Sequence, residues 1–281
     1  MIQTETSFSL LTFNCFGGLN WTTPRRLLAL ARELAQYEPT VACFQEVETH
    51  AARRLLLRAC TSHPEQVFIP GRRAPLGSLL TLAQTPLGTP QFVRYLNQGA
   101  WYSPTLMDRL TQKGALITQL QVGDVPVVMI NTHLVANYGA NWRPDSRAAR
   151  DQQSQLRQLA SLVRDQPPTA LVLVAGDFNI PRGGWLYDEF LMLSGLHDPL
   201  AGDERPTYRP FPGVPARYAL PIDFVFVRPP AHLPIQTEAT LCFGERVALV
   251  GGGQSYLSDH LGVLVTLKIR ETGYGIRDTG D

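Results

Sequence analysis

The chain has 281 residues, of which 44% are hydrophobic and 17% charged. This balance is typical of a globular protein with a sizeable core and excludes a disordered chain. Its 25 Lys and Arg residues nearly balance 24 Asp and Glu residues, and the formal net charge of +1 argues against a strongly basic nucleic-acid-binding surface. A local basic patch around Arg72 and Arg73 is still compatible with this charge.

The sequence alternates β-rich apolar runs with segments whose apolar residues recur at helical spacing. In chain order, we expect a strand at Leu10–Asn14, a helix at Arg25–Tyr37, a strand at Val41–Glu46, a helix at Glu48–Cys60, strands at Gln66–Pro70, Gly77–Leu82, Gln91–Leu96, Gly114–Val122 and Val125–Leu134, a helix at Asp145–Asp165, a strand at Ala170–Ala175, a helix at Gly184–Ser194, and strands at Ile222–Val227 and Leu261–Ile269. Strands and helices in this order predict an α/β fold.

Three segments lie outside these elements. The proline-rich stretch Pro206–Pro221 is expected to be a long ordered loop near the functional site. Trp101–Met107 is expected either to fold onto the sheet edge or to contact a lipid surface as an exposed apolar tip. Residues 271–281 contain three glycines and no apolar periodicity, which predicts a flexible tail after a single domain at residues 1–270.

Polar side chains suited to catalysis lie at the ends of several predicted strands. In Ala170–Pro181, a continuous Leu and Val run, typical of a strand buried on both faces, is followed by Asp177 and Asn179. Asp177 can take a proton from water and Asn179 can donate to an oxyanion, whereas the alternative is an Asx turn. Other strand ends carry Asn14, Glu46, His133, Asp223, Asp259 and His260. We therefore predict one site assembled at the edge of a sheet sandwich.

These residues, in this order, resemble the endonuclease/exonuclease/phosphatase superfamily of metal-dependent phosphoesterases. The motifs that carry the resemblance are Phe13-Asn14, Gln45-Glu46, Thr132-His133-Leu134, Gly176-Asp177-Phe178-Asn179, Ile222-Asp223 and Ser258-Asp259-His260. They cover essentially the whole chain. The resemblance implies a four-layer α/β sandwich, in which two packed mixed β-sheets are flanked by helices.

The resemblance also implies a metal site. Glu46 would be the principal ligand of Mg²⁺, a hard cation that prefers oxygen, with Mn²⁺ as a possible substitute. Asn14 would support the same metal or bind a phosphate oxygen, and Asp259 would supply a second metal contact through water.

Four further roles follow from the same resemblance. Asp177 would deprotonate the attacking water, while Asn179 and an imidazolium His133 would donate to the phosphoryl oxygens. His260 would contact the phosphate opposite the metal, with Asp223 as its orienting partner. Ser258 is expected to cap the turn before Asp259 rather than to react.

Within the superfamily, the chain looks most like the neutral sphingomyelinase and related lipid phosphodiesterase branch. The matching segments are Asn14-Cys-Phe-Gly17, Lys113-Gly-Ala-Leu-Ile-Thr118 and Thr132-His-Leu134 followed by a helix rich in Arg and Gln. The implied partner is a phosphodiester substrate, either a lipid head group or a nucleic acid. A deoxyribonuclease and a non-catalytic module that binds a phosphorylated ligand or a protein stay open as alternatives.

Other hydrolase classes and other locations are less well supported. No Gly-x-Ser-x-Gly elbow is present, and the six histidines form no close zinc-ligand pair. The four cysteines lack CxxC or CxxH spacing and are expected to be buried free thiols. No apolar stretch reaches the roughly 20 residues of a transmembrane segment. We expect a cytoplasmic monomer, or a secreted protein if a signal peptide has been removed.

Overall fold

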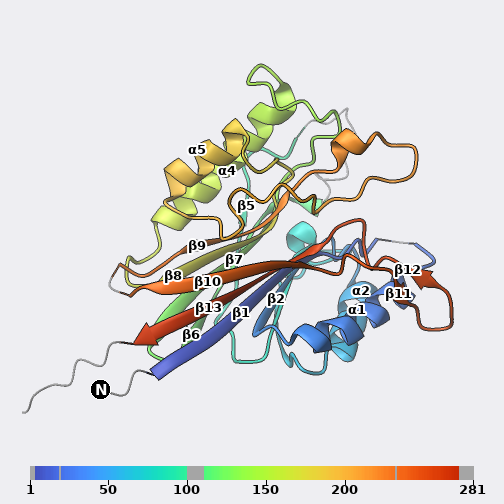
Figure 1. Ribbon diagram of the computed structural model, residues 1–281, viewed down its shortest axis with the longest axis horizontal. Helices are drawn as coiled ribbons and strands as arrows, with labels where there is room; N and C mark the ends of the chain where they lie inside the picture. Colours follow the sequence, from blue (N-terminus) through green and yellow to red (C-terminus); the bar gives the residue numbers. More distant parts are fainter. Residues whose placement is uncertain (1–3, 19, 100–110, 232, 272–281) are drawn as a thin grey trace, which may run out of the picture.

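Two mixed β-sheets pack face to face, and helices cover their outer faces (Figure 1). The computed structural model describes residues 4–18, 20–99, 111–231 and 233–271, so Trp101–Met107 and most of the predicted tail lie outside the described residues. Within these ranges, the predicted four-layer α/β sandwich is confirmed. Among the described helices, none combines the length and apolar character needed to span a membrane.

The first sheet has six strands and joins both ends of the described chain. Its order is β10 (Ile235–Cys242), β13 (Gly262–Glu271), β1 (Thr4–Asn14), β2 (Val41–Gln45), β4 (Leu80–Ala83) and β3 (Glu65–Val67). β1 lies antiparallel to β13 and parallel to β2. Two helices, α1 (Thr23–Tyr37) and α2 (His50–Ala59), cover its outer face (Figure 1). Pro24 occupies the first turn of α1 as predicted, and the Thr49 hydroxyl caps α2 by accepting from the Ala52 amide at 2.9 Å.

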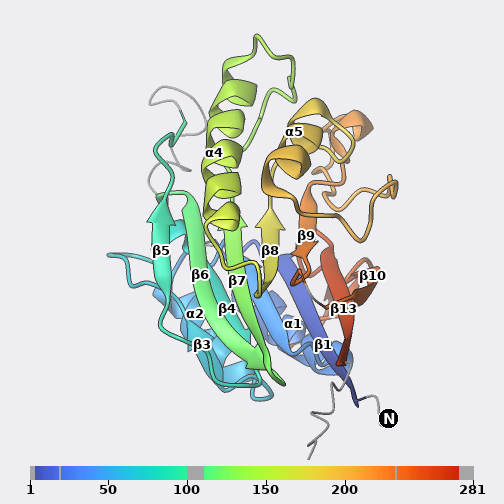
Figure 2. The ribbon, with the colours of Figure 1, turned by 90° about the vertical axis from the view of Figure 1, so that its left-hand side faces the viewer.

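The second sheet has five strands that follow the order of the sequence. They are β5 (Gln91–Arg94), β6 (Gly114–Val122), β7 (Val125–His133), β8 (Leu171–Asp177) and β9 (Asp223–Arg228). Only β7 and β8 run parallel within this sheet, and the helix α4 (Arg147–Arg164) supplies the crossover between them. The helix α5 (Trp185–Ser194) packs beside α4 on the outer face (Figure 2).

The three largest apolar cores among the described residues lie between the layers. One lies between the two sheets, one beneath α4 and α5, and one beneath α1 and α2. β8 shows why its sequence is continuously apolar: Leu171 and Leu173 enter the core between the sheets, whereas Val172 and Val174 pack toward α4 and α5. Full burial of each such side chain stabilises the fold by about 1.5–3 kcal/mol. All four cysteines are buried and free, as predicted.

The structure corrects several predicted elements. The predicted elements do not include β10, because its inward-facing positions include Thr237 and Ala239, which weaken the apolar alternation expected of a half-buried edge strand. Residues 76–78 form a 3-10 turn (η1, Leu76–Ser78) in which Gly77 has a φ of 66°, so the predicted strand starts only at Leu80. β3 ends at Val67, earlier than predicted. A second 3-10 turn, η2 (Ala216–Tyr218), and a small hairpin of β11 (Val247–Ala248) and β12 (Gln254–Ser255) also went unpredicted.

Strand register places the polar strand ends at one edge of the sandwich. In the first sheet, Asn14 lies beside Gln45, the residue before Glu46. In the second sheet, His133 lies beside Asp177, which in turn lies beside Asp223. Because the backbone alone fixes these neighbours, the fold brings together residues that are far apart in the sequence.

Candidate active site

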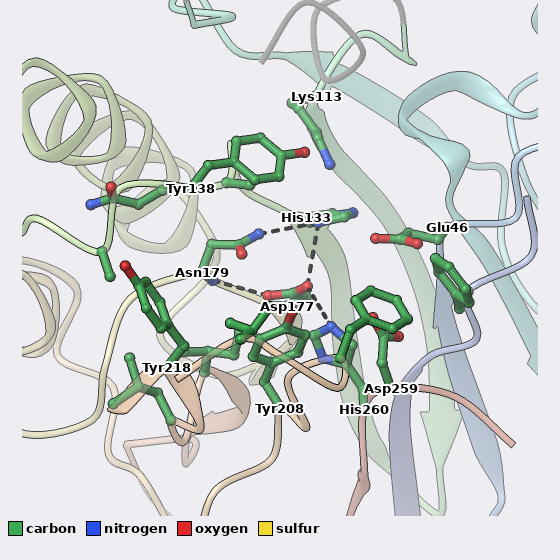
Figure 3. A pocket seen from close by; sticks show the side chains of 18 of the residues that line it. Glu46, Lys113, His133, Tyr138, Asp177, Asn179, Tyr208, Tyr218, Asp259 and His260 are labelled. Carbon is green, nitrogen blue, oxygen red and sulfur yellow. Dashed lines mark hydrogen bonds and ion pairs between the residues drawn. The ribbon is translucent and has the colours of Figure 1, made fainter. Parts of the chain in front are cut away.

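A cavity of about 600 Å³ opens where these strand ends meet (Figure 3). The predicted site residues that line it are Glu46, His133, Asp177, Asn179, Asp259 and His260. The other two, Asn14 and Asp223, are fully buried and bond to residues of the lining. The structure thus brings all eight predicted residues to one place, while the role of each stays a prediction.

Asn14 links two carboxylates at the floor of the cavity. Its side-chain amide donates to Glu46 Oε1 and to Asp177 Oδ2, both at 3.0 Å. Its carbonyl oxygen accepts from the Phe16 backbone at 3.1 Å. In this orientation Asn14 orients the carboxylates, and a direct metal contact through its oxygen requires the amide to turn over.

Glu46 is held in an unusual backbone conformation just after β2. Its φ is 57°, in the left-handed region, which for a residue other than glycine costs on the order of 1–3 kcal/mol. The Gly17 amide donates to the Glu46 carbonyl at 2.9 Å, and a Cβ at Gly17 would lie 2.6 Å from that oxygen. A glycine is therefore needed at this position for the turn that directs Glu46 into the cavity.

Asp177 forms an Asx turn and faces the cavity at the same time. Its Oδ1 accepts from the Asn179 backbone at 3.0 Å, while Oδ2 accepts from Asn14. The Asx turn and the catalytic role predicted for Asp177 are therefore compatible. Gly176 allows β7 to approach closely, because a Cβ there would lie 1.9 Å from the Thr132 carbonyl oxygen. This close approach sets His133 beside Asp177.

His133 and Asn179 lie side by side in the cavity wall, and His133 lies between Asn179 and Glu46 (Figure 3). Asn179 Nδ2 lies 3.2 Å from His133 Nε2 and also donates to the Leu134 carbonyl at 3.1 Å. Burial, followed by the positive charges of Lys113 and His260, lowers the pKa of His133 well below its usual value. This direction favours a neutral imidazole, whereas the resemblance implied an imidazolium at this position.

His260 pairs with Asp223, as predicted. Its Nδ1 lies 2.9 Å from Asp223 Oδ2, and its Nε2 lies 3.7 Å from Asp177 Oδ2. Burial alone would lower the pKa of His260, but the carboxylates of Asp223 and Asp177 outweigh it and raise the pKa well above its usual value. Ser258 caps the turn, since its hydroxyl accepts from the His260 amide at 3.1 Å.

The carboxylates suit a divalent cation. Burial raises the pKa of Glu46 to about 7, although the hydrogen bond from Asn14 lowers it, and burial raises the pKa of Asp177 to about 6. Ligand atoms of Glu46, His133 and Asp177 lie within 4.8 Å of one another. Buried carboxylates with raised pKa values gain from a nearby cation, and an oxygen-rich set is what Mg²⁺ prefers.

A second group and one predicted ligand fit a cation less well. Asp177, Asp223 and His260 also lie within 4.8 Å, but Asp223 and His260 already bond to each other. Among the described residues, Asp259 belongs to neither group, although it lines the cavity.

Lys113 is a site residue that the sequence analysis did not assign. It is buried, comes just before β6 and extends toward His133 (Figure 3). After burial, its charge is the largest contribution to the lowered pKa of His133. Its signal in the sequence is that it opens the matched segment Lys113–Thr118, which leads into a strand that pairs with β7.

Aromatic side chains form much of the cavity wall. They are Phe16, Tyr138, Trp142, Tyr208, Phe211 and Tyr218. Three of them come from the proline-rich stretch, which therefore lies at the site as predicted. The Tyr208 ring lies 5.2 Å from that of His260. The wall offers flat apolar surfaces next to a charged floor.

Known proteins resemble both the sequence and the fold. The model of the Endonuclease/Exonuclease/phosphatase family matches residues 11–260. Similar solved structures include SmcL (18% identity over 92% of this chain and 98% of that chain, TM-score 0.76) and sphingomyelinase C from Streptomyces griseocarneus (22%, 92% and 99%, TM-score 0.69). D. rerio TDP2 complexed with a single-strand DNA product is also similar (18%, 93% and 98%, TM-score 0.72). No curated protein matches the sequence.

Proposed function

Since the chain belongs to the endonuclease/exonuclease/phosphatase family of metal-dependent phosphoester hydrolases, we propose that it is a magnesium-dependent phosphodiesterase acting on lipid head-group esters. The observation that carries this proposal is a single cavity at which the carboxylates of Glu46 and Asp177 lie close to the Asp223–His260 pair. Both are needed for water attack on a phosphodiester assisted by a metal.

Mg²⁺, with Mn²⁺ as a substitute, would be held chiefly by Glu46. Asn14 would orient Glu46 through its amide, and Asp259 would reach the ion through water. When bound, such an ion polarises a phosphoryl oxygen and neutralises developing negative charge.

The protein's own residues would handle the proton and the phosphate. Asp177 would take a proton from water, and its pKa of about 6 lies near the pH at which a general base works best. As the water oxygen bonds to phosphorus, the bond from phosphorus to the leaving-group oxygen breaks. Asn179 and the charged His260 would donate to the phosphoryl oxygens, and Lys113 would add a further positive charge.

The aromatic wall and the near-neutral charge support a small head group over duplex DNA. A net charge of +1 provides little general attraction for a polyanion. Aromatic faces such as those of Tyr138 and Tyr218 suit a quaternary ammonium group. Similarity to sphingomyelinase C from Streptomyces griseocarneus supports the same choice.

A second candidate is hydrolysis of single-stranded nucleic acid. The similar TDP2 structure contains a single-strand DNA product, and the same aromatic faces can stack on bases. A non-catalytic binding module is a weaker alternative, because binding alone does not require Glu46, Asp177 and His260 around one cavity.

A substrate panel tests these proposals. Sphingomyelin, a lysophospholipid, single-stranded and duplex DNA, and inositol phosphates should each be incubated with and without chelator, with Asp177→Asn as the matched control. We expect chelator-sensitive release of the phosphorylated head group from a choline lipid. Faster cleavage of single-stranded DNA would favour the second candidate, and no hydrolysis with any substrate would favour a binding module.

A further inference from the structure

A pair of buried amides connects the two sheets directly beneath the site. Gln45, the last residue of β2, donates through Nε2 to Oδ1 of Asn131 on β7 at 2.8 Å. Both side chains are fully buried. Gln45 immediately precedes Glu46, and Asn131 comes two residues before His133. One hydrogen bond thus joins the strand ends that carry Glu46 and His133.

Asn131 makes further bonds into the opposite sheet. Its amide nitrogen lies 3.3 Å from the Phe44 carbonyl oxygen, 3.1 Å from that of Leu80 and 3.2 Å from Thr81 Oγ1. These acceptors belong to β2 and β4, whereas Asn131 belongs to β7. One side chain of the second sheet therefore contacts two strands of the first.

The polar side chains of Gln45 and Asn131 lie next to an apolar core. The neighbouring core between the sheets is apolar and includes Cys43, Val127 and Met129. Apolar contacts have no preferred direction, so they define the relative position of two sheets less sharply than hydrogen bonds do. Hydrogen bonds require defined distances and angles, and a buried network with its partners in place specifies one geometry.

We infer that Gln45 and Asn131 form a cross-sheet clamp that sets the position of Glu46 relative to His133 and Asp177. The three groups that could hold a cation come from both sheets, and their ligand atoms lie within 4.8 Å. Sliding of one sheet by a fraction of an ångström would change that separation. Gln45 and Asn131 are positioning residues under this inference, which rests on the proposed function for its catalytic consequence but not for its effect on cation binding.

The experiment compares variants that cut the clamp with variants that leave it intact. Asn131→Leu removes all four hydrogen bonds of Asn131 to the first sheet. Of these four, Gln45→Met removes only the bond between Gln45 and Asn131. Thr12→Val is the control within the network, because Thr12 bonds Gln45 at 3.0 Å from the same sheet. Val265→Ala is the control for lost stability, since Val265 is fully buried in the core between the sheets.

Three quantities are measured for each full-length protein: Mn²⁺ affinity by titration, kcat and KM, and the midpoint of thermal unfolding. Well below that midpoint, we expect Asn131→Leu to weaken Mn²⁺ binding by about 10–100-fold and to lower kcat by a similar factor, with KM nearly unchanged. Gln45→Met should show the same pattern more weakly. Thr12→Val and Val265→Ala should lower the unfolding midpoint while retaining Mn²⁺ affinity and kcat.

The inference is overturned if Asn131→Leu and Gln45→Met lose stability but keep Mn²⁺ affinity and kcat. It is also overturned if Val265→Ala lowers Mn²⁺ affinity and kcat as much as the clamp variants do. Should Asn131→Leu fail to fold, Gln45→Met decides, because it leaves the other bonds of Asn131 in place. Failure of the proposed function would appear differently, as a wild-type protein that binds Mn²⁺ and hydrolyses none of the substrates. In that case the Mn²⁺ affinities of the variants still test the clamp.

Discussion

The two sheets contribute different halves of the site. The first sheet and its adjoining turns supply Asn14, Glu46, Asp259 and His260, whereas the second sheet and its adjoining turns supply His133, Asp177, Asn179 and Asp223. The key bonds cross between them: Asn14 donates to Asp177 at 3.0 Å, and Asp223 lies 2.9 Å from His260. Neither sheet contains a complete set, so the chemistry depends on how the sheets are packed.

The halves also differ in how they hold their carboxylates. Asp177 ends a regular strand whose register places it beside His133. Glu46 follows its strand in a left-handed turn supported by Gly17. The second sheet thus positions its acid by pairing and the first by a turn, which leads us to expect that Glu46 is the more sensitive of the two to changes in its neighbours.

Replacement of Asp177, the proposed base in the second sheet, should have the largest effect on turnover. Asp177→Asn keeps the size of the side chain and its Asx oxygen but removes the proton acceptor, so turnover should fall by about 10²–10⁴-fold. Steady-state kinetics on the best substrate of the panel measures this loss, and circular dichroism should show an unchanged fold. Full activity would refute the assignment of Asp177.

Variants of the Asp223–His260 pair, which bridges the sheets, should have the next largest effect on turnover. His260→Ala should lower turnover by about 10²-fold or more, since it removes a charged donor to the phosphate. Asp223→Asn should have a smaller effect, because it keeps the imidazole of His260 and removes only the carboxylate that stabilises its positive charge. If both variants matched the wild-type kcat, the site would not use this pair.

Loss of the carboxylate of the first sheet should act mainly through the metal. Chelation should abolish activity, and Glu46→Gln should raise the Mg²⁺ concentration needed for half-maximal activity by about 10–100-fold. A Mg²⁺ titration of activity distinguishes this from Asp177→Asn, which should lower the plateau. Equal Mg²⁺ requirements in Glu46→Gln and the wild type would place the metal elsewhere.

The smallest effect is expected at Lys113. Lys113→Met keeps an unbranched side chain but removes the positive charge that faces the cavity, and kcat/KM should fall by about tenfold. Arg72→Met, which changes an exposed cation, is the matched control and should leave kcat/KM unchanged. A tenfold loss in both variants would indicate general attraction of the substrate rather than a local contact.

The sequence by itself determined most strands, the strand-end residues and the family, because apolar periodicity and short motifs are local properties. β10 is absent from the predicted elements because Thr237 and Ala239 on its inner face weaken the apolar alternation. The lowered pKa of His133, the approach of Lys113 to His133 and the bond between Gln45 and Asn131 were decided by the tertiary structure. Each depends on burial or on contact between residues distant in the sequence, such as Asn14 and Asp177, which are 163 positions apart. Desolvation and cross-sheet distances arise only when the sheets pack.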